Sequence, residues 1–162
     1  MYRYSLDTVE AVCQSSLQNC HQARRVVAAV VTNGPDLALF KRSFKVSGGC
    51  GLWHCITGFL EPGVHARQQV VEEIYEESSL SPDCLNLIKA RDLSLSDAQG
   101  NAWQVHAFHY ESNSREFQIN WESDDAQWFP MTQLRDLATV PWLADVISGL
   151  HLHAVMKNRL FC

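Results

Sequence analysis

The sequence predicts an α/β sandwich with a mixed sheet. Strand-like runs lie on both sides of one strong central helix, and further helices close the chain. This order of elements favours a sheet with helices packed on it. The chain has 162 residues, of which 46% are hydrophobic and 19% charged, values that suit one compact domain with a sizeable core. We therefore predict a single domain over residues 1–162.

The first predicted elements follow from composition and turn residues. A helical N-terminal extension is expected at residues 1–22, with an amphipathic helix at 6–17. The run RVVAAVVT at 25–32 is typical of a buried strand, and the turn residues at 33–36 lead to a returning strand at 37–42. A flexible loop is expected at 47–51, a short strand at 53–57 and a loop at 58–65.

The strongest helix is predicted at residues 66–78, with Pro82 soon after its end. Three strand-like runs follow it, at 85–93, 102–110 and 126–129. Two helices are then expected, at 132–137 and from Trp142 to about Met156. Strands before and after a central helix, with helices at the end, give the predicted sandwich.

The charge pattern limits the class of partner. The formal net charge is −5 and there is no cluster of Lys and Arg, so extended nucleic acid is excluded as the main partner. No apolar stretch is long enough to span a bilayer, and the first residues lack the apolar core of a signal peptide. A cytoplasmic location is therefore expected, without a membrane partner.

The six cysteines show no C-x-x-C spacing, and the favoured interpretation is reduced, structural thiols. Cys50, His54 and Cys55 lie close together and form a less favoured zinc alternative, because a second ligand pair at the spacing of a zinc finger is missing.

The predicted central helix carries Glu72, Glu73, Glu76 and Glu77. At about 100° per residue, the last three fall within roughly 100° of one another, with Glu72 just beyond Glu76. The opposite side is expected to hold the apolar residues Val70, Val71 and Ile74. Like charges at this spacing repel, and a divalent cation with carboxylate ligands would reverse that effect. The alternative is a merely solvated acidic face.

The preceding loop adds a spaced pattern to the acidic helix. Gly58, the loop Glu61-Pro62-Gly63 and then Glu73, Ile74, Glu76, Glu77 and Leu80 stand in register with G-x5-E-x7-R-E-U-x-E-E-x-G-U, where U is aliphatic. The segment therefore resembles the Nudix box. The resemblance extends over about residues 25–150, through the first hairpin, the W-x-x-I-T-G segment and the acidic loop at Trp121-Glu122.

Three positions depart from the box. Val64 replaces its first Glu, Glu72 replaces its Arg, and Ser79 replaces its Gly. The change at Ser79 is mild if this residue need not adopt a positive φ. Glu72 is the more serious departure, because a carboxylate cannot make the ion pair by which the family's Arg holds a catalytic Glu. It could instead recruit a Lys or Arg, or raise a neighbour's pKa by repulsion.

The resemblance implies a Nudix-type α/β/α sandwich with a central catalytic helix. It implies a pyrophosphohydrolase that uses Mg²⁺, with Mn²⁺ as a substitute, to hydrolyse a diphosphate linkage in a nucleoside triphosphate or another nucleoside diphosphate derivative. Glu76 and Glu77 would hold the metal, and Glu73 would be a further ligand or the general base. The carbonyl of Thr57 and the side chain of Glu122 are the other ligand candidates.

The candidate substrate-binding residues are Arg42, Trp53 and Gly58, and the partner is a small-molecule nucleotide. Alternatives stay open for three residues: a solvated strand end for Arg42, the core for Trp53, and a plain surface position for Glu122. The family also allows a homodimer. Two other functions compete, namely a catalytically weak or inactive Nudix module that senses a nucleotide, and a partner-binding domain that uses the terminal helices.

Overall fold

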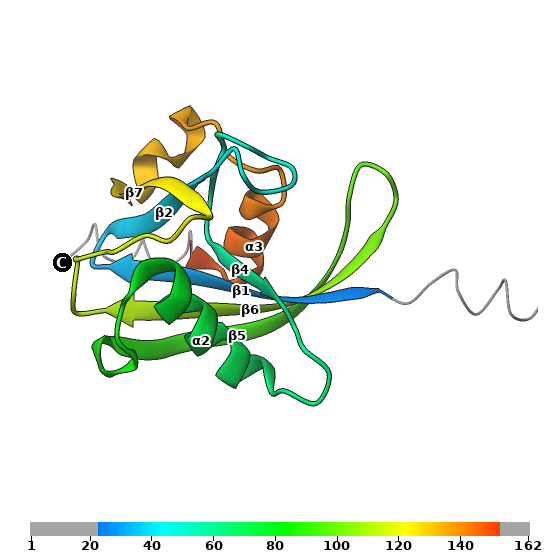
Figure 1. Ribbon diagram of the computed structural model, residues 1–162, viewed down its shortest axis with the longest axis horizontal. Coiled ribbons are helices and arrows are strands. Elements are labelled where there is room, and N and C mark those ends of the chain that lie inside the picture. The colour runs from blue at the N-terminus through cyan, green and yellow to red at the C-terminus, as the bar shows by residue number, and fades with distance from the viewer. Residues whose placement is uncertain (1–22, 153–162) are drawn as a thin grey trace, which may run out of the picture.

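The computed structural model describes residues 23–152 (Figure 1). Seven strands form one sheet along the path β3-β2-β1-β6-β5, with β4 paired to β1 and β7 paired to β2. The pair β1–β6 is parallel and the other pairs are antiparallel. These features confirm the predicted α/β class and mixed sheet. The predicted helix at 6–17 lies outside the described residues.

The first half of the chain follows the prediction with one change. Strands β1 (Arg24–Asn33) and β2 (Asp36–Arg42) form the expected hairpin, whose turn includes Gly34 at φ 57°. The predicted strand at 53–57 is split at Cys55 into β3 (Trp53–His54), which pairs with β2, and β4 (Ile56–Phe59), which pairs with β1. This segment can pair with both strands because β1 and β2 are paired only beside their turn. Strand β4 also includes Gly58 and Phe59, which the sequence predicts as loop.

The second half contains α2 (Ala66–Ser78), with the predicted bounds. After it come η1 (Pro82–Cys84), β5 (Leu85–Ser96), β6 (Ala102–Ser112), β7 (Ser123–Pro130), η2 (Met131–Asp136) and α3 (Leu143–Gly149). The predicted helix at 132–137 is thus a 3-10 helix. The last predicted helix ends at Gly149, short of Met156, and His151 then adopts a positive φ of 55°. The predicted part beyond residue 152 lies outside the described residues.

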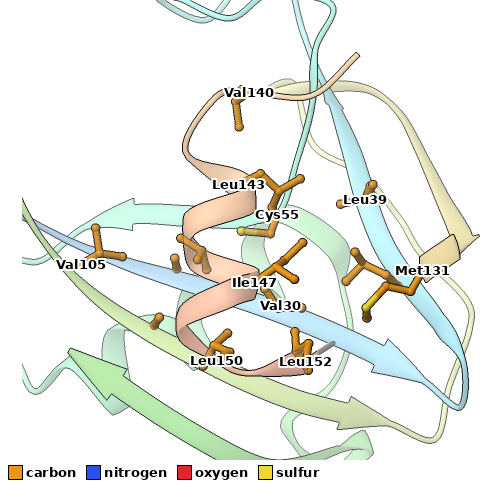
Figure 2. Packing of buried hydrophobic residues seen from close by; sticks show 14 residues of the cluster. Val30, Leu39, Cys55, Val105, Met131, Val140, Leu143, Ile147, Leu150 and Leu152 are labelled. Atoms are coloured by element: carbon orange, nitrogen blue, oxygen red, sulfur yellow. The ribbon is translucent and has the colours of Figure 1, made fainter. Parts of the chain in front are cut away.

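The sheet separates two helical layers. In β1, Ala28 and Val30 point to the cluster that contains α3, whereas Val27, Ala29 and Val31 point to the cluster that contains α2. Figure 1 shows α2 on one side of the sheet and α3 on the other, and Figure 2 shows the α3 cluster with side chains of α3 meeting those of the strands. The order is therefore α/β/α, as predicted. Within residues 23–152, no helix is long and apolar enough to cross a membrane.

Candidate active site

The orientation of α2 places its carboxylates at different depths. Val70 and Ile74 are fully buried against the sheet, and Glu77 is only 1% exposed. Glu77 follows Val70 by seven residues, close to two helical turns, so both residues lie on one stripe. The prediction that the apolar residues lie opposite the carboxylates is therefore wrong for Glu77. Glu73 is half-buried at the edge of the stripe and Glu76 is exposed.

Glu77 is fixed against strand β4. Its Oε1 accepts a hydrogen bond of 3.2 Å from the backbone N–H of Thr57. Its Oε2 is buried and has no hydrogen-bond partner in the described part of the chain. Burial, followed by the negative charge of Glu122, raises the pKa of Glu77 well above its ordinary value. One oxygen is thus held by the strand, and the other is left without a partner.

Glu73 lies against the backbone of Gly58. A Cβ at position 58 would stand 1.9 Å from the Oε1 of Glu73, so only glycine leaves room for this carboxylate. Gln69 holds the same oxygen by donating a hydrogen bond of 3.0 Å from Nε2. Burial raises the pKa of Glu73, and the charges of Glu76, Glu122 and Glu61 raise it further. Gly58 thus leaves the space that the carboxylate of Glu73 occupies.

The loop before β7 brings Glu122 to the same place. Its carbonyl accepts a hydrogen bond of 2.8 Å from Ser43, which follows β2, and its N–H donates to the Oδ1 of Asn120 at 2.9 Å. Its charge raises the pKa of both Glu73 and Glu77. The charge of Glu122 is therefore close enough to act on Glu73 and Glu77, although Glu77 and Glu122 are 45 residues apart in the sequence.

The carboxylates of this site offer oxygen ligands of the kind that a hard divalent cation prefers. Between residues 23 and 152, no three His, Cys, Asp or Glu side chains converge to form a complete metal centre, so neither a ready carboxylate site nor the zinc alternative at Cys50, His54 and Cys55 is formed. The fit to Mg²⁺ rests on the buried, unpartnered Oε2 of Glu77 beside other carboxylates. Mg²⁺ commonly takes one or two protein carboxylates and completes its octahedron with water and substrate phosphate.

Glu72, the main departure in the box, does not act on Glu73. It is exposed, and its Oε1 accepts a hydrogen bond of 3.0 Å from Gln68. The neutral amide of Gln69 holds Glu73 instead. Sequence reasoning missed Gln69, although its i, i+4 spacing to Glu73 was a visible signal, because an uncharged residue in an acidic helix does not suggest a role.

Ser79 ends α2 in the left-handed conformation, with φ 59° and ψ 15°. The condition under which the Gly-to-Ser change would be mild is therefore not met, and a non-glycine residue in this region costs roughly 1–2 kcal/mol. The N–H of Ser79 donates to the carbonyl of Tyr75 at 2.8 Å, and its hydroxyl donates to the carbonyl of Gln118 at 3.2 Å. These contacts hold the strained residue in place.

The predicted substrate-binding residues do not all lie at the carboxylates. The side chain of Arg42 donates to the carbonyls of Gly48 (2.9 Å) and Ser47 (3.3 Å), yet its charge still lowers the pKa of Glu77. Trp53 packs with the α3 cluster and meets Phe129 edge to face, with ring centroids 4.9 Å apart. The structure therefore brings Arg42 and Gly58 to the carboxylates, but not Trp53.

Comparison with known proteins gives one family. The model of the NUDIX domain matches residues 22–150. No curated protein matches the chain. A C. elegans Ap4A hydrolase in a binary complex has 16% identity and a TM-score of 0.66 over 82% of this chain and 98% of its own. The NUDIX domain of Shewanella oneidensis NrtR, complexed with ADP ribose, has 17% identity and a TM-score of 0.63 over 90% and 97%.

A third solved structure contains a metal ion. It is a bifunctional NMN adenylyltransferase/ADP ribose pyrophosphatase from Francisella tularensis, complexed with AMP and a Mn ion. It has 18% identity and a TM-score of 0.66, over 91% of this chain and 46% of its own. At such identities the solved structures show a common fold, and the family model covers most of the chain.

Proposed function

The chain belongs to the Nudix family, whose pyrophosphohydrolases act on acid anhydrides, and from this we propose that it hydrolyses a diphosphate linkage in a nucleoside triphosphate or another nucleoside diphosphate derivative. The observation that carries the proposal is the buried carboxylate of Glu77, whose Oε2 has no partner among the described residues, next to the half-buried Glu73. An unpaired buried carboxylate lowers stability, and a cation bound at that oxygen would offset the cost.

The metal would be held by Glu76, Glu77 and the carbonyl of Thr57, with Glu122 as a further ligand. A bound Mg²⁺, or Mn²⁺ in its place, supplies positive charge for the phosphate oxygens and the leaving group. Arg42 supports the same site with a second positive charge close enough to lower the pKa of Glu77. The remaining chemistry belongs to the side chains of α2.

Glu73 is the proposed general base. Its raised pKa brings it closer to neutral pH, where a carboxylate accepts a proton from water more effectively. Gly58 and Gln69 fix its position, so the attacking water can be oriented without further movement of the side chain. The water would attack one phosphorus of the diphosphate and Glu73 would take its proton. The bond from that phosphorus to the bridging oxygen would break, and the other phosphate group would leave with that oxygen.

A nucleotide sensor without turnover is the second candidate. It is favoured by one observation: Glu72 stands where the family has Arg, is exposed, and accepts a hydrogen bond from Gln68. The hydrogen bond from Gln69 to Glu73 favours the enzyme, because it holds the proposed base without that Arg. A cytoplasmic location and a homodimer remain further proposals.

The decisive experiment is a substrate panel. Nucleoside triphosphates, dinucleoside polyphosphates and ADP-ribose are incubated with the protein and Mg²⁺, and release of phosphate, pyrophosphate or nucleotide is measured. Glu76→Gln is expected to lose most of the rate, because it removes a charged ligand of the metal that stabilises the phosphate oxygens and the leaving group. Glu72→Gln is the matched control, since both residues are exposed on α2, and it is expected to keep the rate of the wild type. Equal inactivity of wild type and Glu76→Gln on every compound would reject the enzyme in favour of the sensor.

A further inference from the structure

His54 is a buried histidine whose ring nitrogens lack hydrogen-bond partners within the described part of the chain. The residue is 3% exposed, and neither Nδ1 nor Nε2 has a hydrogen-bond partner among residues 23–152. Burial lowers the pKa of the ring and the nearby backbone of Cys55 raises it, but this backbone is not in hydrogen-bonding geometry with either ring nitrogen. Buried polar atoms are nearly always paired, and an unpaired group calls for a ligand, a water or a strained role.

The position of His54 in the sheet places it on the active-site face. In the β2–β3 ladder His54 stands opposite Phe40, and paired residues of adjacent strands project to the same face. Phe40 belongs to the α2 cluster, whereas the neighbouring Trp53 packs with the α3 cluster. The imidazole is therefore on the same side of the sheet as Glu73 and Glu77.

Other unpartnered atoms gather around the same strand end. Ser123 has a buried hydroxyl without a partner in the described residues, and it stands opposite Arg42 in the β2–β7 ladder. Glu77, with its free Oε2, is bonded to Thr57, three residues after His54. Two of these groups thus lie beside β2, and the third is hydrogen-bonded to the strand that follows His54.

The chemistry of the ring narrows what His54 could bind. Burial, with a smaller contribution from the charge of Arg42, lowers its pKa to about 3, so the imidazole is neutral at physiological pH. A neutral imidazole offers one N–H donor and one acceptor nitrogen. Phosphate oxygens accept only, and they are better matched by Arg42. The edge of a heterocyclic base, which carries donors and acceptors side by side, matches the ring.

We propose that His54 is a specificity-determining residue that hydrogen-bonds the heterocyclic base of a nucleotide whose phosphates lie at Glu73 and Glu77. The proposal rests on the proposed function and deepens it, because it names the residue that recognises the base of the nucleotide. A site with buried polar groups rejects an analogue that cannot pair with them, so the base adds affinity that the phosphates alone do not give.

The test measures binding rather than turnover. The probes are non-hydrolysable nucleoside triphosphate analogues with each of the four common bases, and inorganic tripolyphosphate, titrated with Mg²⁺ into the wild type and His54→Leu. His54→Leu is expected to weaken the best nucleotide at least about tenfold and to leave tripolyphosphate within about twofold. Its thermal midpoint should stay or rise, because the variant removes an unsatisfied polar group.

His109→Leu is the matched control. His109 is also buried and has a pKa lowered to about 4, but its Nε2 is paired with the Oγ1 of Thr32 at 2.8 Å. This variant should lower the thermal midpoint and leave nucleotide affinity unchanged. His54→Asn, which keeps a donor and an acceptor, should retain more nucleotide affinity than His54→Leu.

Three results would overturn the proposal. One is a His54→Leu variant that loses stability but binds the nucleotide normally, as expected if the ring only holds a structural water. Another is an equal loss for nucleotide and tripolyphosphate, and the third is a wild type that binds both probes equally well. Because binding is measured without turnover, base-dependent binding by a protein that hydrolyses nothing would reject the hydrolase and keep the role of His54.

Discussion

On the α3 side of the sheet the buried residues are apolar except for Cys55 and the pair Thr32 and His109, which hydrogen-bond to each other. On the α2 side apolar residues share the buried region with Gln69, Glu77 and His54. The α3 cluster includes residues of β1, β2, β6 and α3 (Figure 2). The α2 side carries unsatisfied polar atoms at Glu77 and His54. The α3 face therefore contributes stability. The unsatisfied polar groups on the α2 face lower stability, but they are available to bind a ligand.

The largest expected effect is on the α3 face. Leu143→Ala removes a side chain that is 1% exposed in the α3 cluster, and such a truncation costs roughly 2–5 kcal/mol of the free energy of unfolding. Urea denaturation measures this loss. Well below the midpoint the rate on the best substrate should stay within about twofold of the wild type, because α3 does not touch the carboxylates. A large loss of rate in fully folded Leu143→Ala would contradict the separation of the two faces.

A pair of glycine variants applies one chemical change to each face. In Gly58→Ala the new Cβ would lie 1.9 Å from the Oε1 of Glu73, and in Gly149→Ala it would lie 2.6 Å from a methyl of Leu93. Both neighbours are movable side-chain ends, so both variants should fold. Displacing the proposed base by about 1 Å is expected to cost on the order of 10²-fold in rate, whereas a shifted leucine methyl should cost none. Steady-state kinetics and thermal midpoints are compared, and equal rates in the two variants would argue against Glu73 as the base.

The α2 face also marks where sequence reasoning succeeded and where it stopped. The bounds of α2 follow from local signals, the helical period and Pro82. The register of the box predicted Glu73, Glu77 and Gly58 as one site, and the structure brings these residues close together. The spacing of Glu77 to Val70 predicts that Glu77 is buried, whereas the negative charge of its side chain predicts that it is exposed. Local sequence indicates which residues share a stripe, and only packing shows which side of that stripe the sheet covers.

Other features depended on contacts between distant segments. The split of residues 53–59 into β3 and β4 arises because each half finds a different partner strand. Trp53 points to the α3 cluster because its place in the β2–β3 ladder alternates with that of His54. The unpaired ring nitrogens of His54 could not be predicted from the sequence, because the whole fold determines whether a buried polar group finds a hydrogen-bond partner.

A smaller effect is expected on the pH dependence of the free energy of unfolding, through Glu77 on the α2 face. Because burial raises the pKa of Glu77, the folded protein keeps a proton there at pH values at which the unfolded chain has lost it. The free energy of unfolding therefore falls as pH rises from about 4.5 towards the raised pKa. Glu77→Gln should remove this fall and be more stable than the wild type at pH 8 without divalent cations, by roughly 1–3 kcal/mol.

The measurement is the thermal midpoint of both proteins between pH 5 and 9, with and without Mg²⁺. Millimolar Mg²⁺ should raise the midpoint of the wild type at pH 8 and leave Glu77→Gln nearly unchanged, because the variant lacks the carboxylate charge. Parallel pH curves for the two proteins would mean that Glu77 is not the group that destabilises this face.

The smallest effect distinguishes two neighbouring glutamines on α2. Gln69 donates to Glu73 and Gln68 donates to Glu72, both at 3.0 Å and both at i, i+4 spacing. Only the first bond reaches the proposed base, and it lowers that base's pKa. Gln69→Leu should therefore move the acidic limb of the pH–rate profile to higher pH, with a change in stability below about 1 kcal/mol. Gln68→Leu should leave the limb in place, since Glu72 is exposed and takes no part in the proposed reaction. A shift of the same size in both variants would show that the helix as a whole, and not the single hydrogen bond from Gln69, sets the pKa of Glu73.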